Sequence, residues 1–101
     1  MSTSPTADAT RVSTTTNITA TFSEAMLASS INGTTFKLFK KGSTTKLSAT
    51  DSYDASTNTA TLDPTNSLRS GVTYTAVVTT GAKDLAGKPL TQQHSWFFTV
   101  G

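Results

Sequence analysis

Apolar and polar residues alternate along most of this chain, and the alternation is that of β-strands. Tyr74, Ala76 and Val78 take one face, and Thr73, Thr75, Val77 and Thr79 take the other. A period of two with many β-branched residues is typical of a strand with one buried face. Leu68 and Gly71 precede this strand, and the spacing predicts a tyrosine corner, in which the Tyr74 hydroxyl bonds to upstream backbone. The alternative is an ordinary core tyrosine after a turn.

The same pattern predicts the other strands and their inward faces. They fall at Thr10–Ser13, Asn17–Phe22, Thr35–Lys40, Leu47–Tyr53, Thr59–Leu62 and His94–Val100. The largest inward side chains are Ile18, Phe22, Phe36, Trp96 and Phe98. At most one short helical turn is expected, before Ile31. This pattern predicts an all-β fold, an Ig-like two-sheet antiparallel β-sandwich of about seven strands.

One hairpin register places a charged residue toward the core. A turn that pairs Asp54 with Thr59 puts Asp51 opposite Leu62, and opposed residues share a face of the sheet. An unpaired buried carboxylate is costly. Asp51 is therefore expected to lie at the rim, to pair with a cation such as Lys46, or to bind a metal, and the rim is the favoured interpretation.

Length and composition limit the other possibilities. The 101 residues form one domain, with a linker over residues 1–9 and the folded module over 10–101. Charged residues make up only 14% of the chain and the net charge is +2, so no nucleic-acid partner is expected. There is no cysteine, which excludes disulfides and thiolate metal sites. No apolar stretch is long enough to insert into a membrane.

Several segments, in unbroken order, resemble a class of bacterial Ig-like domains found in S-layer proteins and large surface or secreted proteins. They are Asn17–Met26, Ser30–Phe36, Tyr53–Thr61, Leu68–Tyr74, Lys83–Gly87 and Trp96–Thr99. The resemblance implies an extracellular, secreted or cell-surface module without catalytic residues. It also implies neighbouring domains in the same chain, and a role as spacer, stalk or adhesive scaffold.

Two residues depart from the pattern of that class. Asp51 stands where an apolar residue is usual, and Phe39 stands where a small polar residue is usual. Phe39 is expected to point outward beside Lys37 and Lys41. An outward aromatic residue between two cations predicts a contact patch for a neighbouring module or another partner.

Residues capable of chemistry are few. His94 is the single histidine and no nucleophile elbow is present, so no enzymatic activity and no cofactor are expected. A calcium site is the more plausible alternative, because calcium takes oxygen ligands and loop carboxylates at module junctions supply them. Glu24, Asp84 and Asp8 are the candidates, and turn capping is the alternative role for Asp84.

The sequence leaves two classes of function open. One is a structural spacer that is stabilised by its own core and needs no ligand. The other is a binding module for glycan, protein or calcium that is accessory to a neighbouring domain, using Phe39 with the lysines, or the loops.

Overall fold

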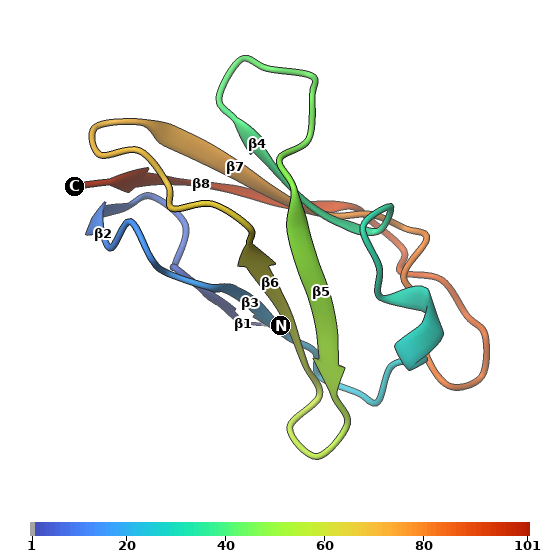
Figure 1. The fold of residues 1–101 in the computed structure, drawn as a ribbon. Coiled ribbons are helices and arrows are strands. Elements are labelled where there is room, and N and C mark those ends of the chain that lie inside the picture. Colours follow the sequence, from blue (N-terminus) through green and yellow to red (C-terminus); the bar gives the residue numbers. More distant parts are fainter. Residues whose placement is uncertain (1) are drawn as a thin grey trace.

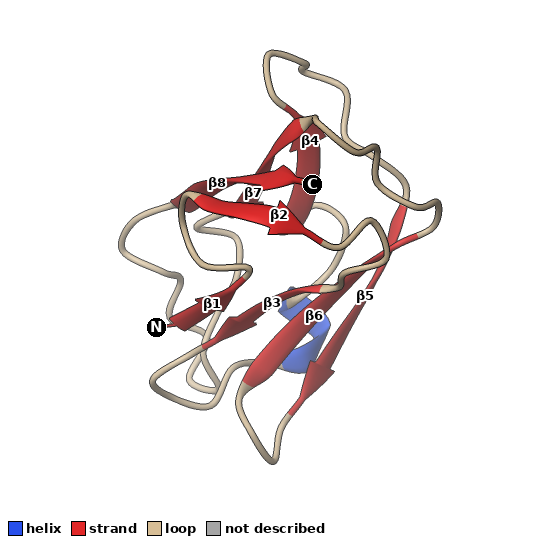
Figure 2. Cartoon of the chain, turned by 90° about the vertical axis from the view of Figure 1, so that its left-hand side faces the viewer, coloured by secondary structure: helices blue, strands red, loops and turns tan. Residues whose placement is uncertain are grey.

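The computed structural model describes residues 2–101 and contains two four-stranded sheets packed face to face (Figures 1 and 2). The strands are β1 (Ser2–Ser4), β2 (Ala9–Val12), β3 (Ile18–Thr21), β4 (Phe36–Lys40), β5 (Ala49–Asp54), β6 (Thr59–Pro64), β7 (Thr73–Val78) and β8 (His94–Val100). A single 3-10 turn, η1 (Ala28–Ser30), is the one helix of residues 2–101. No helix in that range is long and apolar enough to cross a membrane. The predicted two-sheet β-sandwich is confirmed.

The two sheets have different strand directions. Sheet A has the order β1-β3-β6-β5, and all of its pairs are antiparallel. Sheet B has the order β2-β8-β7-β4, and β2 runs parallel to β8. The sandwich is therefore mixed, and the expectation of a wholly antiparallel one does not hold at this edge. The chain leaves β1 in sheet A, crosses to sheet B, and enters beside the last strand in the same direction.

The N-terminal segment differs from the predicted linker. Ser2–Ser4 forms β1 and pairs with β3, in the register Ser2 opposite Thr21 and Ser4 opposite Thr19. Ala9 already begins β2. The composition of residues 1–9 hides these strands, because serine and threonine suit both a linker and the outward positions of an edge strand.

The core lies between the inner faces of the two sheets. Its largest fully buried side chains are Phe36, Phe98, Ile18, Leu38, Leu62, Val78 and Val100. The predicted inward residues Phe22 and Trp96 are each 6% exposed. The η1 region seals one end, where the buried Met26 donates its amide to the hydroxyl of Tyr53 at 2.8 Å.

The β5–β6 hairpin has the register that its turn predicts. Asp54 opposes Thr59 and Asp51 opposes Leu62. A carboxylate oxygen of Asp54 accepts hydrogen bonds from the amide and the hydroxyl of Ser56, at 2.9 and 2.6 Å. These bonds close the turn and lower the pKa of the Asp54 carboxyl.

Candidate functional site

Tyr74 connects the start of β7 to the turn that precedes it. Its side chain is buried, and its hydroxyl accepts a hydrogen bond from the amide of Arg69 at 2.8 Å. This is the upstream backbone bond of a tyrosine corner. Gly71 takes a φ of +82° within the turn, a backbone conformation that favours glycine, and its amide donates to the carbonyl of Val100 at 2.7 Å. The corner thereby joins this turn to the end of β8.

Leu68 and Trp96 are buried and contribute to the packing of the sandwich. Leu68 is buried, and its amide donates to the carbonyl of Thr14 at 2.7 Å. The ring of Trp96 lies 6.4 Å from that of Phe36, measured between centroids. Its indole nitrogen is buried and has no hydrogen-bond partner among residues 2–101. Both residues therefore serve the packing of the sandwich.

The outward side chains of three of the four strands of sheet B, β4, β7 and β8, form a grid of three rows and three columns, here called the sheet B outer face. The register aligns Lys37, Val77 and Ser95 in the first row, Phe39, Thr75 and Phe97 in the second, and Lys41, Thr73 and Thr99 in the third. Facing residues on neighbouring strands lie close enough to form one surface. Residues from β4, β7 and β8 thus meet on this face.

The sheet B outer face carries two aromatic rings, each with a lysine ammonium group near it. Phe39 and Phe97 flank Thr75 from opposite sides. The Lys37 ammonium lies 6.0 Å from the centroid of the Phe39 ring, and the Lys41 ammonium lies 5.4 Å from that of Phe97. Both distances are within reach of a cation–π interaction. Phe97 is 46% exposed, whereas Phe39 is only partly exposed.

The structure therefore brings Phe39, Lys37 and Lys41 together on one face, as the sequence predicts, and adds Phe97. The alternation of β8 already points Phe97 away from the core, because its neighbours Trp96 and Phe98 are buried. Its position in the same row as Phe39 depends on the strand order, which local pattern does not give.

The outward positions of sheet A, here called the sheet A outer face, have a different chemistry. One row holds Ser2, Thr21, Thr59 and Asp54, the next holds Ser4, Thr19, Thr61 and Ser52, and the last holds Asp63 and Thr50. Each of these ten positions carries a hydroxyl or a carboxylate. Thr21 and Thr59 are joined by a hydrogen bond of 3.0 Å between their hydroxyls. This face has an acidic character and the sheet B outer face a basic one.

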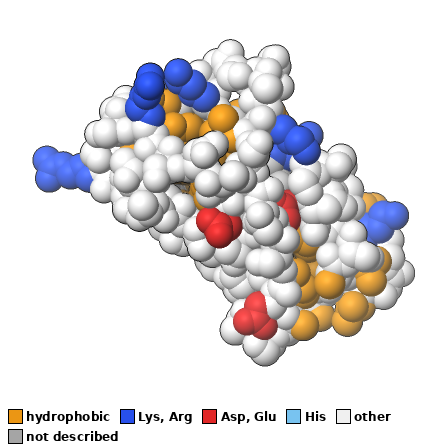
Figure 3. Space-filling view, in the orientation of Figure 1, with side chains coloured by type: hydrophobic (Ala, Val, Ile, Leu, Met, Phe, Trp, Pro, Cys, Tyr) orange, Lys and Arg blue, Asp and Glu red, His pale blue; other side chains and the backbone are white. Residues whose placement is uncertain are grey.

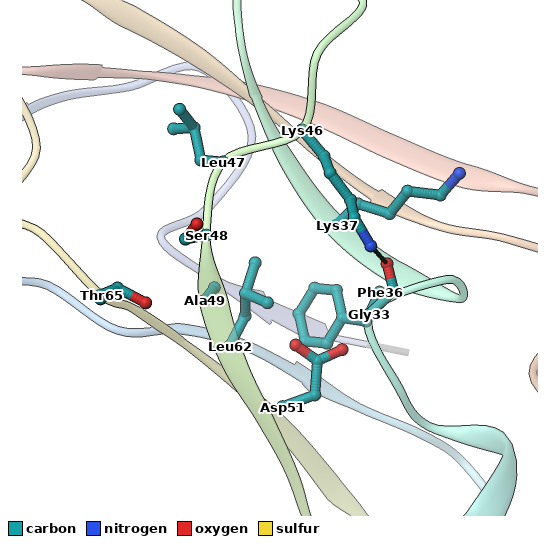
Figure 4. Close-up of a pocket in the computed structure, with 10 residues that line it drawn as sticks. All are labelled: Gly33, Phe36, Lys37, Lys46, Leu47, Ser48, Ala49, Asp51, Leu62 and Thr65. Carbon is teal, nitrogen blue, oxygen red and sulfur yellow. Dashed lines mark hydrogen bonds between the residues drawn. The ribbon is translucent and has the colours of Figure 1, made fainter.

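Asp51 lies at the edge of sheet A with its side chain toward the interior. Both carboxylate oxygens are buried and have no hydrogen-bond partner within residues 2–101. The carboxylate lines a pocket of about 200 Å³ together with Phe36, Leu62 and Leu47. Figure 4 shows it directed toward the ring of Phe36. The favoured interpretation of Asp51 at a solvated rim is therefore wrong.

Lys46 is close to this pocket but is bonded elsewhere. Its ammonium donates to the carbonyl of Gly33 at 2.8 Å, as the dashed line in Figure 4 shows. Burial raises the pKa of Asp51 to about 6, and the charge of Lys46 opposes this rise. Lys37 also lines the pocket. The ammonium of Lys37 itself points away from Asp51 and lies over the Phe39 ring. A single carboxylate beside one lysine is a poor cation site, because calcium takes six to eight oxygen ligands.

The three calcium candidates do not come together. Glu24 and Asp84 line one pocket of about 190 Å³ that also contains Lys88. An Asp84 carboxylate oxygen accepts the amides of Ala86 and Lys88, both at 2.9 Å, which is the capping role. Asp8 lies beside β8, where its amide donates to the carbonyl of Phe97. Residues 2–101 contain no group of three potential ligands among His, Cys, Asp and Glu.

This geometry is that of a small Ig-like β-sandwich, and sequence comparison agrees with the fold. The profile of the bacterial Ig-like domain family matches residues 1–100, so the chain belongs to that family. No curated protein matches the chain significantly.

Solved structures with the same fold include S-layer proteins. The match to the crystal structure of the S-layer protein rSbsC(31-844) has 27% sequence identity and a TM-score of 0.72. It covers 100% of this chain and 13% of the S-layer chain. A structure of domains 1-6 of surface layer protein SbsC is 28% identical with a TM-score of 0.71, and covers 93% of this chain and 13% of that one. The chain therefore spans a small part of these S-layer chains and resembles a segment of a multi-domain protein.

A third structure shows the fold alone. PcoC, a methionine-rich copper resistance protein from Escherichia coli, has a TM-score of 0.80 at 22% identity, with 100% of this chain and 95% of that chain covered. Because the match covers 95% of the PcoC chain, a sandwich of this fold also makes up nearly the whole of a small protein.

Proposed function

We propose that this chain is a non-catalytic structural module that acts as a spacer or stalk within a larger bacterial protein, secreted or at the cell surface. The observation that carries the proposal is the similarity of the chain, over its full length, to a small part of a multi-domain S-layer protein. Its partners are then, first of all, the neighbouring domains of its own chain. Enzymatic activity is not part of the proposal, because the described residues form no nucleophile, base and orienting group in contact.

The path of the chain suits this role. Ser2 opposes Thr21 at the end of β3. The next residue, Phe22, donates its amide to the carbonyl of Asn58 in the turn of the β5–β6 hairpin. The C-terminus lies at the left end of the molecule in Figure 1, where the amide of Gly101 donates to the carbonyl of Val12, whereas β1 lies near the middle of that view. The chain therefore enters and leaves the module at separate places, so that copies can follow one another.

An apolar surface is present at the end that carries η1. Leu85 is 67% exposed and Leu27 is 36% exposed, and the amide of Leu27 donates to the carbonyl of Lys83 in the same loop region. Figure 3 shows orange side chains at the lower right, where Figure 1 places η1 and the loop between β7 and β8. Exposed leucines at one end fit a contact with another module.

Copper binding, which the name of PcoC describes for that protein, is not proposed here. Copper sites use methionine, cysteine and histidine. This chain has two methionines, one histidine and no cysteine. Met26 is buried in the core and His94 is an exposed strand residue.

Small-angle X-ray scattering on one, two and three copies joined head to tail tests the spacer role. The module measures 40 × 26 × 22 Å. The maximum dimension should increase by close to 40 Å with each added copy if the array extends. An increase of only 22–26 Å, as for modules lying side by side, would contradict the proposal.

A further inference from the structure

The two outer faces of the sandwich have opposite charge, and this separation is not needed for folding. The sheet B outer face carries Lys37 and Lys41 in its grid, and the sheet A outer face carries Asp54 and Asp63. Figure 3 shows red side chains in the centre and at the bottom of one view, and blue ones at the top, at the two ends and right of the centre. Each face is therefore complementary in charge to the other face of a second copy.

The sheet B outer face also carries apolar side chains, which a purely solvated face does not need. Val77 is 9% exposed although it points away from the core cluster. Phe97 is the most exposed aromatic ring at 46%. Apolar side chains with charged residues beside them are typical of a protein contact surface. The acidic residue Asp8 lies beside this face, where its amide donates to the carbonyl of Phe97.

We propose that the sheet B outer face of one copy packs on the sheet A outer face of a copy in a neighbouring chain. Lys37 and Lys41 then face Asp63 and Asp54, while Phe39 and Phe97 lie over the threonines of β3 and β6. Stacking of two sheets is an ordinary packing mode of β-sandwiches. This contact goes beyond the spacer role, because it joins different chains instead of modules along one chain.

The area of the grid is small compared with the area that a stable protein interface buries. Three strands about 4.8 Å apart, with outward residues about 6.7 Å apart along each, give roughly 300 Å² per partner. A stable interface buries about 800 Å² per partner. A single contact is therefore weak and salt-dependent, and becomes effective only when many copies act together.

The contact uses different surfaces on the two partners, and these surfaces lie on opposite sides of the sandwich, so successive copies continue in one direction. Each copy that offers its sheet B outer face keeps its sheet A outer face free for another copy. Contacts of this kind generate open arrays instead of closed dimers. The expected assembly is a row of laterally associated modules.

Amide chemical shifts of the 101-residue chain, followed from about 0.05 to 2 mM at low salt, test the proposal, because weak binding of this size is populated at millimolar concentration. Both outer faces should shift with concentration, and sodium chloride at about 0.5 M should suppress the shifts. Shifts that are absent at every concentration, or confined to the η1 end, would overturn the proposal.

Charge reversal on each face identifies the partner surface. Lys41→Glu and Asp63→Lys should each weaken association about tenfold, and an equimolar mixture of the two variants should restore it, because one intact pair of faces remains between them. Lys83→Glu, in the loop after β7, is the control and should change association less than twofold. A normal amide spectrum for each variant shows that it folds.

Other outcomes contradict the pairing of these two faces. If Lys41→Glu weakens association but Asp63→Lys does not, the partner of the sheet B outer face is not sheet A. If the protein alone shows no concentration dependence, but polygalacturonate shifts the residues around Phe97, the face binds an anionic glycan and the proposed contact between copies is wrong.

Discussion

The two outer faces of this sandwich are built by the same alternation and differ in what they expose. The sheet A outer face carries only hydroxyls and carboxylates, with threonines bonded across strands as in the pair of Thr21 and Thr59. The sheet B outer face exposes Phe39 and Phe97 on either side of Thr75, with Val77 in the next row and two lysines along β4 and directly after it. The inner faces must both be apolar to build one core, but the outer faces are free to differ, and here the difference points to contact with other molecules.

Substitutions at an inner and an outer position of the same strand should show the largest difference in the free energy of unfolding. Phe36 and Phe39 both lie on β4, but Phe36 is 1% exposed and packs against Trp96, whereas Phe39 lies on the outer face. Phe36→Ala should lower the free energy of unfolding by about 3–5 kcal/mol, because it leaves a cavity in the core. Urea denaturation measures the loss.

Phe39→Ala is the matched control for that experiment. Because Phe39 is only partly exposed, its loss should cost about 1 kcal/mol. Equal losses for Phe36→Ala and Phe39→Ala would show that β4 does not separate an inner from an outer face.

The corner that connects the two sheets gives the next largest effect. Tyr74→Phe removes the hydroxyl that accepts the amide of Arg69, and this amide is then left without its partner. The free energy of unfolding should fall by about 1–3 kcal/mol. Tyr53→Phe is a useful comparison, because its hydroxyl likewise accepts a backbone amide, from Met26. An unchanged urea midpoint for Tyr74→Phe would exclude a stabilising role for the corner.

Asp51 should make stability depend on pH in the direction opposite to most carboxylates. Its pKa is raised from 3.8 to about 6 by burial, so the folded protein holds this proton more tightly than the unfolded chain. The stabilisation is complete below about pH 4 and is lost as the pH rises through about 6. The loss should be about 1–2 kcal/mol, less than the full shift, because water and Lys46 screen the charge.

Asp51→Val tests this assignment. The variant should be more stable than the wild type at pH 7 by about 1–2 kcal/mol, and the difference should vanish near pH 4. Asp63→Asn, on the exposed side of the same hairpin, should leave that pH dependence unchanged. A destabilised Asp51→Val at pH 7 would mean that the carboxylate has a partner in solution, such as Lys46.

The sequence predicts local geometry well because local geometry depends on neighbours in the chain. The turn after Asp54 sets the hairpin register, so the position of Asp51 opposite Leu62 could be derived before the structure. Gly71 and Tyr74 likewise belong to one short segment. The fold class follows from many such segments and from the resemblance to bacterial Ig-like domains.

The remaining features depend on contacts between distant segments. Strand β1 and the parallel pairing of β2 with β8 could not be predicted, because short polar strands have no hydrophobic pattern of their own. The row of Phe39, Thr75 and Phe97 requires the order β4-β7-β8. The burial of Asp51 also escaped prediction, because it depends on how Phe36 from the other sheet closes over the carboxylate.

Phe97→Ser gives the smallest expected effect on folding and the most direct test of the difference between the two outer faces. The ring is 46% exposed, so the free energy of unfolding should change by less than about 0.5 kcal/mol. The concentration-dependent amide shifts of the sheet B outer face should nevertheless disappear, because the most exposed ring of the contact is gone. Unchanged association, or a loss of stability comparable to that of Phe36→Ala, would contradict the account.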